Sequence, residues 1–190
     1  MSLKHLGGCI INNHVGDVGS WTPEIWNKII EDYKPKSIID VGCGGGYSLK
    51  YFLDRNIEGI GVEGFDDAIL ASPVKSHIVK HDYSSGPYVP EKRYDFAWTC
   101  EFVEHVEEKY VDNFMQTVSM CDLVGMTHAV PGQGGYHHVN CQTSEYWINV
   151  FKKYNFFYLE EESINLRELQ KTNPVYGQWA KNTFMLFKQH

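Results

Sequence analysis

The chain lacks several features that would place it in a specialised class of protein. None of its apolar runs reaches the roughly 18 residues that a membrane-spanning helix needs, and the first residues, MSLKHLGGCIINNHVGD, contain no apolar segment typical of a signal peptide. The five cysteines include no C-x-x-C pair, which argues against a disulfide framework and a zinc ribbon. These absences predict a cytoplasmic protein with reduced thiols and no membrane partner.

Positive charge is also scarce. The 17 lysines and arginines stand against 24 aspartates and glutamates, which gives a net charge of −7. A protein whose whole surface binds nucleic acid would carry the opposite balance. The chain has 190 residues, of which 43% are hydrophobic, so it is long enough to close one core and too short for a separate substrate domain. We therefore predict one domain over residues 1–190.

Short apolar strands alternate with amphipathic helices along the chain, a pattern that favours an α/β sheet with crossover helices. Four helices are expected. One covers 22–33, one begins directly after the glycine-rich loop at 40–46, and two cover 105–118 and 143–154. No helix of crossover length is evident between the last two strands, so we predict an antiparallel pair joined by a long polar excursion over 162–182. The expected strands are 37–42, 59–64, 77–81, 94–100, 122–129, 156–161 and 183–188.

The glycine-rich loop DVGCGGG (40–46) follows a buried strand and leads into a helix. Such a turn lies at the carboxyl edge of a parallel sheet, where α/β folds bind ligands, and its missing side chains let a ligand approach the backbone. A dinucleotide fingerprint would need a third glycine at position 47, which is Tyr47. Because Asp40 would repel a pyrophosphate, the loop favours a ligand with an ammonium group or a cationic sulfur.

The spacing D-x-G-x-G-x-G at 40–46 resembles the first motif of the class I S-adenosylmethionine-dependent methyltransferases, and the order of parts over residues 36–160 agrees with that family. The resemblance implies a Rossmann-like, doubly wound and mostly parallel seven-stranded sheet with an antiparallel C-terminal strand. It also implies S-adenosylmethionine as the methyl donor. The residues implied to bind the donor are Asp40, Gly42, Cys43, Gly44, Gly46, Glu63, Asp82, Tyr83, Glu101 and Phe102.

The same resemblance gives these residues their roles. Glu63, at the end of the second strand, matches the acidic residue that accepts hydrogen bonds from the ribose hydroxyls. Asp82 matches the acid that binds the adenine amino group, with Tyr83 covering the ring. The segment YDFAWTCEFVEHV (94–106) resembles the family's small-molecule and sugar-acting branch, where Glu101 and Phe102 would flank the sulfonium and the adenine. Together these acids suit a cationic donor.

Methyl transfer from a sulfonium is an in-line displacement, so a hydroxyl acceptor needs only positioning and a base. The histidines weighed for that role are His14, His105, His128, His137 and His138. The last two stand in the loop PGQGGYHHVN (131–140), and we predict that one of them is the base, with loop bracing as the alternative. His105 is expected to pack or cap, and His128 to be buried and hydrogen-bonded.

No metal site is predicted, because adjacent histidines point apart in regular structure and no recognised ligand spacing is present. Residues 1–35 are expected to form a helical lid, and 162–182 to face the acceptor. The resulting open site favours a small-molecule or carbohydrate acceptor, or completion of the site by the partner in a homodimer. Three alternatives stay open: an RNA methyltransferase, an NAD-dependent oxidoreductase and a non-catalytic nucleoside-binding module.

Overall fold

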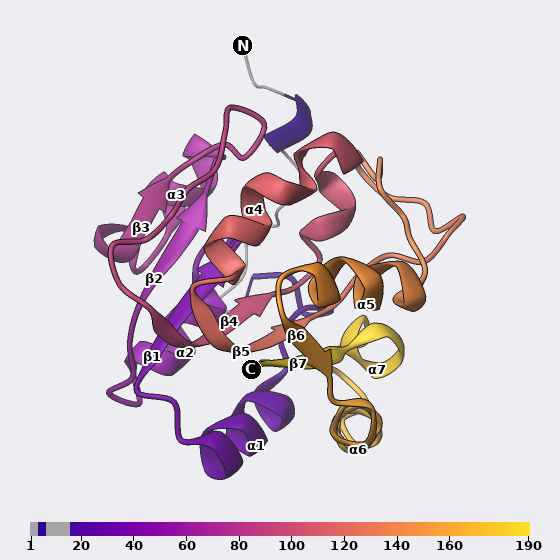
Figure 1. The fold of residues 1–190 in the computed structure, drawn as a ribbon. Helices are drawn as coiled ribbons and strands as arrows, with labels where there is room; N and C mark the ends of the chain where they lie inside the picture. The colour runs from indigo at the N-terminus through magenta and orange to yellow at the C-terminus, as the bar shows by residue number, and fades with distance from the viewer. Residues whose placement is uncertain (1–3, 7–15) are drawn as a thin grey trace.

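The computed structural model describes residues 4–6 and 16–190 (Figure 1). Its centre is a seven-stranded sheet in the order β3-β2-β1-β4-β5-β7-β6. Cys9 and His14 lie outside the described residues. The strands are β1 Ser37–Val41, β2 Glu58–Glu63, β3 Ile78–Lys80, β4 Tyr94–Thr99, β5 Cys121–Met126, β6 Phe156–Tyr158 and β7 Met185–Gln189.

The first five strands pair in parallel, and the last strand runs against its neighbours. β1 pairs with β2 and β4, β2 with β3, and β4 with β5, all in parallel register. β7 is antiparallel to both β5 and β6. The predicted mostly parallel, Rossmann-like sheet with an antiparallel C-terminal strand is therefore confirmed.

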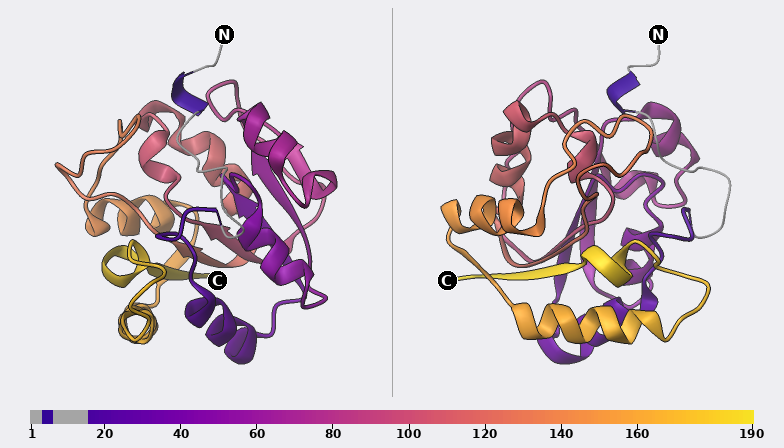
Figure 2. Two further views of the ribbon diagram at one scale, coloured as in Figure 1. Left: turned by 180° about the vertical axis from the view of Figure 1, so that it is seen from behind. Right: turned by 90° about the vertical axis from the view of Figure 1, so that its right-hand side faces the viewer.

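Helices cover both faces of the sheet (Figure 2). Successive strand residues point to opposite faces, so in β1 Ile38 packs on one side and Ile39 on the other. The Ile39 side is covered by α4 and α5, and the Ile38 side by α1, α2 and α6. The helices are α1 Pro23–Tyr33, α2 Tyr47–Leu53, α3 Asp66–Ala71, α4 Val111–Val118, α5 Ser144–Lys153, α6 Glu160–Lys171 and α7 Ala180–Thr183.

The helix expected over 105–118 is interrupted. Single 3-10 turns occupy Val103–His105 and Glu108–Tyr110, and regular helix begins only at Val111. The carbonyl oxygen of Glu104 accepts hydrogen bonds from the amides of Val139 and Asn140, at 2.9 and 3.1 Å. This carbonyl is thus committed to the distant 131–140 loop, and the turn stays separate from α4.

The structure corrects the sequence prediction of a polar, helix-free excursion over 162–182. Much of it belongs to α6, which packs against α1 and β7 and buries Leu166. Arg167 donates a hydrogen bond to the carbonyl of Phe184 and so braces the fold instead of facing an acceptor. Within the expected helical lid over 1–35, α1 packs into the core through the fully buried Trp26 and Ile29, and the lid itself stays a prediction.

Candidate active site

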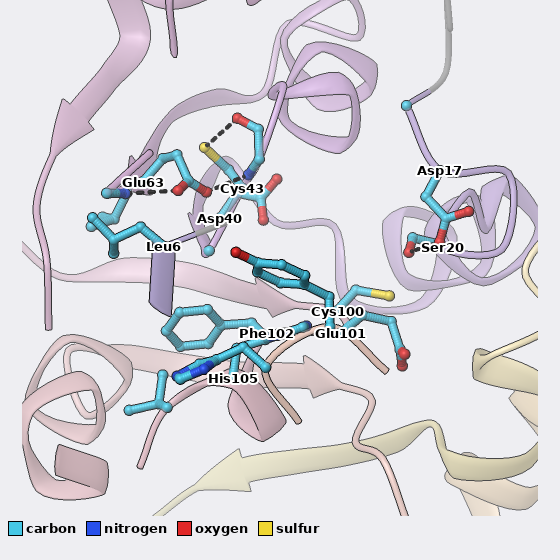
Figure 3. Close-up of a pocket in the computed structure, with 18 of the residues that line it drawn as sticks. Leu6, Asp17, Ser20, Asp40, Cys43, Glu63, Cys100, Glu101, Phe102 and His105 are labelled. Carbon is cyan, nitrogen blue, oxygen red and sulfur yellow. Dashed lines mark hydrogen bonds between the residues drawn. The ribbon is translucent and has the colours of Figure 1, made fainter. Parts of the chain in front are cut away.

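A cavity of about 410 Å³ opens at the carboxyl ends of the parallel strands (Figure 3). This is the edge of a doubly wound sheet at which ligands bind. Figure 3 shows Glu63 toward one end of the cavity, and Asp17 with Ser20 at the other. After the sequence prediction, we name the first the donor end and the second the acceptor end. The cavity wall includes every residue predicted to bind the donor except Gly46, as well as His137 and His138.

The glycine loop adopts a conformation that side chains would oppose. Gly42, Gly44 and Gly46 have φ values of 71°, 51° and 71°, in the left-handed region that glycine tolerates. A Cβ atom at Gly42 would lie 2.2 Å from Cδ2 of Phe102. The loop therefore presses against Phe102 and leaves its backbone open to the cavity, as the sequence predicted. Gly46 faces Val74 and serves instead to begin α2.

Glu63 closes the donor end through three backbone amides. Its Oε2 accepts from the amide of Gly44, and its Oε1 accepts from those of Gly64 and Phe65, each at 2.8 Å. Burial raises the pKa of Glu63, and these hydrogen bonds oppose that shift. The carboxylate ties the glycine loop to the end of β2 and still lines the cavity.

Asp40 lies beneath the loop and is only 2% exposed. Its Oδ2 accepts a hydrogen bond from the hydroxyl of Ser48 at 2.5 Å. Burial raises the pKa of Asp40 to about 7, and the nearby charge of Glu63 acts in the same direction. Two acidic groups with raised pKa values thus face one region, an arrangement that a positive charge would stabilise.

Asp82 binds partners at both carboxylate oxygens. Oδ1 accepts from the amide of Ser84 at 2.8 Å, and Oδ2 lies 2.9 Å from Nε2 of His5. Partial burial acts the other way, but these hydrogen bonds lower the pKa of Asp82. Tyr83 contributes its ring to the cavity wall, yet its hydroxyl meets Thr117 in the core at 2.9 Å.

Glu101 marks the passage to the acceptor end. Its φ of 52° is rare for a residue with a side chain and indicates backbone strain of the kind found at functional sites. Thr127 holds it twice: the hydroxyl accepts from the Glu101 amide at 2.8 Å and donates to Oε1 at 2.9 Å. Burial raises the pKa of Glu101.

The acceptor end is built from chain segments far apart in sequence. Asp17 accepts from the hydroxyl of Ser20 at 3.1 Å and from the indole Nε1 of Trp179 at 2.9 Å. The ring of Trp21 also lines the cavity. Of the excursion over 162–182, Trp179 lines the cavity, whereas Arg167, Lys171 and Tyr176 are absent from its wall; an acceptor-side role for the excursion stays a prediction.

The histidines weighed as the base lie in different surroundings. The ring of His137 lies 6.4 Å from that of His5, between ring centres, and so belongs near Asp82. The ring of His138 lies 5.0 Å from that of His105, and its charge would act on Glu101. His128 is 1% exposed and contacts Ser144 Oγ at 3.0 Å, which confirms that it is buried and hydrogen-bonded.

Sequence reasoning missed Glu104, although it quoted the E-x-x-E-H pattern that contains it. The residue is fully buried. Burial and the neighbouring Glu101 raise the pKa of Glu104 well above its usual range. Burial also lowers the pKa of His105 to about 4, so this imidazole is neutral near pH 7. Burial raises the pKa of the Cys100 thiol, which disfavours the thiolate form that a nucleophile needs.

Residues 18–121 match the model of a family described as a methyltransferase domain. This span holds the glycine loop, Glu63, Asp82 and Glu101, and it exceeds half of the chain. The chain belongs to this methyltransferase family. The predicted enzyme class, S-adenosylmethionine-dependent methyltransferase, is thereby confirmed, and with it the methyl donor.

Solved structures share the methyltransferase fold at low identity. The plantazolicin methyltransferase BpumL in complex with SAH is 15% identical, with a TM-score of 0.61 over 89% of this chain and 83% of that one. A SAM-dependent methyltransferase from Archaeoglobus fulgidus is 16% identical, with a TM-score of 0.59 over 89% and 92%. The magnesium protoporphyrin IX methyltransferase of Synechocystis PCC 6803 with bound SAM is 10% identical, with a TM-score of 0.62 over 88% and 76%.

These likenesses concern the fold and leave the acceptor of this methyltransferase undetermined. No curated protein matches its sequence. Among the helices of the described residues, none has the length and apolar character needed to cross a membrane.

Proposed function

We propose that this methyltransferase transfers a methyl group to a hydroxyl oxygen of a polar small-molecule or sugar-like acceptor. The observation that carries the proposal is the continuity of one cavity from Glu63 to Asp17 and Ser20. The indole rings of Trp21 and Trp179 also line this cavity. Carboxylates and hydroxyls beside aromatic rings offer hydrogen bonds and apolar contact to an acceptor rich in hydroxyls.

At the donor end, we assign the carboxylate of Glu63 to the ribose hydroxyls and the Gly44–Gly45 backbone to the space beside the ribose. Asp82 takes the adenine amino group, and Phe102 packs beside the adenine. Asp40 and Glu101 contribute negative charge around the sulfonium and the donor's ammonium group. The fit rests on the three amides that already orient Glu63, and on a glycine loop that side chains would fill.

The bound donor supplies a methyl carbon that is already activated by its cationic sulfur. The chain's residues then hold the acceptor oxygen in line with that carbon and exclude water. The acceptor hydroxyl loses its proton, its oxygen forms the bond to the methyl carbon, and the sulfur keeps the electron pair of the broken bond. Two groups at the cavity wall can take the proton: the Glu101 carboxylate and the His138 imidazole.

Donor binding and methyl transfer require separate measurements. Calorimetric titration with S-adenosylmethionine, with its demethylated product and with NAD is expected to give heat with the first two only. Incubation with labelled donor and fractionated cell extract should then leave label on a small polar compound. Label that disappears after ribonuclease treatment would identify an RNA acceptor and overturn the proposed acceptor class. Donor binding without any labelled product would favour a binding module.

The two candidate bases are separable by kinetics. If Glu101 takes the proton, Glu101→Gln lowers kcat by about 10²- to 10⁴-fold, a loss that persists when the donor is saturating. Glu58→Gln serves as the matched control, because Glu58 is an exposed carboxylate that pairs with Lys92 away from the cavity. An unchanged kcat in both Glu101→Gln and His138→Ala would remove general-base catalysis from the proposal.

A further inference from the structure

Three side chains outside the proposed donor contacts gather near Glu101: Glu104, His105 and His138. Each offers one carboxylate oxygen or ring nitrogen, and these atoms all lie within 4.8 Å of one another. His105 and His138 line the cavity, whereas Glu104 approaches from the buried side. The three side chains therefore converge on a point at the cavity wall.

Glu104 has no exposed surface, no N–H or O–H group of another described residue donates to its carboxylate, and among those residues only the carboxyl of Glu101 lies within hydrogen-bond range of it. The Nδ1 atom of His105 is also buried and unpartnered. Buried polar atoms are nearly always satisfied, so two such groups in one cluster call for an explanation. A cation at the point of convergence would satisfy the ring nitrogen of His105 and neutralise the neighbouring carboxyls of Glu101 and Glu104.

The ligand chemistry narrows the choice of cation. Two imidazoles and one carboxylate form a donor set suited to transition metals, whereas calcium and magnesium prefer oxygen atoms alone. Zinc sites that keep an open position commonly use three protein ligands, including two histidines with one glutamate. The open position would face the cavity through His105 and His138.

We propose that Glu104, His105 and His138 bind a divalent transition-metal ion, with zinc as the best match to the ligands. The role of this ion rests on the proposed function: it would hold the acceptor oxygen at the open position. His138 is then occupied as a ligand, and Glu101 remains as the group that takes the proton. Ligand spacing alone predicted no metal site, and this proposal replaces that prediction.

The test measures metal binding without donor, acceptor or turnover, so it is independent of whether methyl transfer occurs. Untagged full-length protein is stripped with a chelator and titrated with Co²⁺, whose visible absorption reports ligation, and then challenged with Zn²⁺. We expect about one equivalent of Co²⁺ to bind, and we expect Zn²⁺ to displace the bound Co²⁺. A wild-type protein without Co²⁺ absorption, or with binding only through thiolates, overturns the proposal.

Glu104→Gln keeps the shape of the side chain and removes its charge. We expect it to weaken Co²⁺ binding at least about 100-fold, since even the groups that orient metal ligands are worth 10- to 100-fold. Glu108→Gln is the control, because this glutamate is exposed and only four positions away in the same segment. Equal affinity in Glu104→Gln and wild type contradicts the site.

Circular dichroism establishes whether Glu104→Gln is folded. If it is not, His138→Ala decides, because His138 lies in the partly exposed 131–140 loop, away from the sheet. Retained Co²⁺ affinity in that variant overturns the proposal. Methyl transfer that fails while Co²⁺ binding persists contradicts the proposed function and leaves the metal site standing.

Discussion

The two ends of the cavity differ in how their buried acids are satisfied. At the donor end, Glu63 receives three backbone amides and Asp40 receives a hydroxyl from this same chain. Beside Glu101, the fully buried Glu104 receives no N–H or O–H donor from the other described residues and meets only the carboxyl of Glu101. The donor end is thus preorganised by hydrogen bonds within the fold. The other side of the cavity holds a buried carboxylate to which no N–H or O–H group elsewhere in the described chain donates. Four predictions test or refine this contrast.

The largest effect is expected from Gly42→Ala. The added Cβ would lie 2.2 Å from Phe102 in a backbone of φ 71°, so overpacking and strain together should cost roughly 2 to 6 kcal/mol of folding stability. Donor affinity should fall with it, because the loop must shift. Denaturant unfolding and calorimetry measure both. Gly134→Ala is the control, since nothing lies within 4 Å of its Cβ position and its φ is not left-handed. Equal losses in the two variants would refute the role of the loop.

The second prediction concerns pH and Asp40. Its folded pKa of about 7 exceeds the ordinary 3.8, so the folded state keeps a proton that the unfolded state loses. Stability should therefore fall as pH rises from about 4 to 7, by at most about 4 kcal/mol from this group. In Asp40→Asn this part of the decline should vanish.

Asp54→Asn, on an exposed carboxylate that pairs with Lys50, should keep the full decline. Because Glu63, Glu101 and Glu104 also have raised pKa values, they contribute a decline of the same sign. The comparison of the two variants isolates Asp40. A wild-type profile in Asp40→Asn would show that this carboxyl does not titrate in the stated window.

Glu63→Ala should weaken donor binding by roughly 1.5 to 3 kcal/mol, the range for a hydrogen bond to a charged group. The amides of Gly44, Gly64 and Phe65 would also lose their acceptor, so stability should decline as well. Glu58→Ala at the opposite end of β2 is the control, because that exposed residue pairs with Lys92 away from the cavity. Unchanged donor affinity in Glu63→Ala would remove this residue from the site.

The smallest effect is expected from His5→Ala. His5 contacts Asp82 at 2.9 Å, and its loss should change donor affinity by about 0.5 to 1.5 kcal/mol, as for a typical hydrogen bond. His77→Ala, at an exposed position, should bind the donor like the wild type. A loss as large as that of Glu63→Ala would mean that the donor end also depends on contacts outside its backbone.

The sequence predicted the sheet because its strands are short and apolar, and because each acid at a strand end stood at an expected distance from the glycine loop. It failed for α6, whose buried face includes Ser163 and Gln170. Each makes a hydrogen bond in the fold: Ser163 accepts from the amide of Leu186, and Gln170 donates to the carbonyl of Tyr176. Polar residues on the inward face weakened the helical pattern and made the segment resemble a loop.

Sequence reasoning also missed the surroundings of Glu104 and of the Tyr83 hydroxyl, for a related reason. A sequence gives the type of residue at each position, but burial without a donor is a property of the surrounding atoms. Nothing in E-x-x-E-H distinguishes Glu101, which accepts from Thr127, from Glu104, which receives no such donor within the described residues. Likewise, the spacing placed Tyr83 beside the adenine, while its hydroxyl is engaged by Thr117.

The hydrogen bond from Trp179 to Asp17 joins positions near opposite ends of the chain, and the amide of Gly177 donates to the carbonyl of Val18 at 3.0 Å beside it. Neither segment belongs to a strand. Under the proposed function, the choice of acceptor would change through substitutions in these two segments, which lie outside the strands of the sheet. A combinatorial library confined to 16–21 and 176–179 is accordingly the economical route to new acceptors.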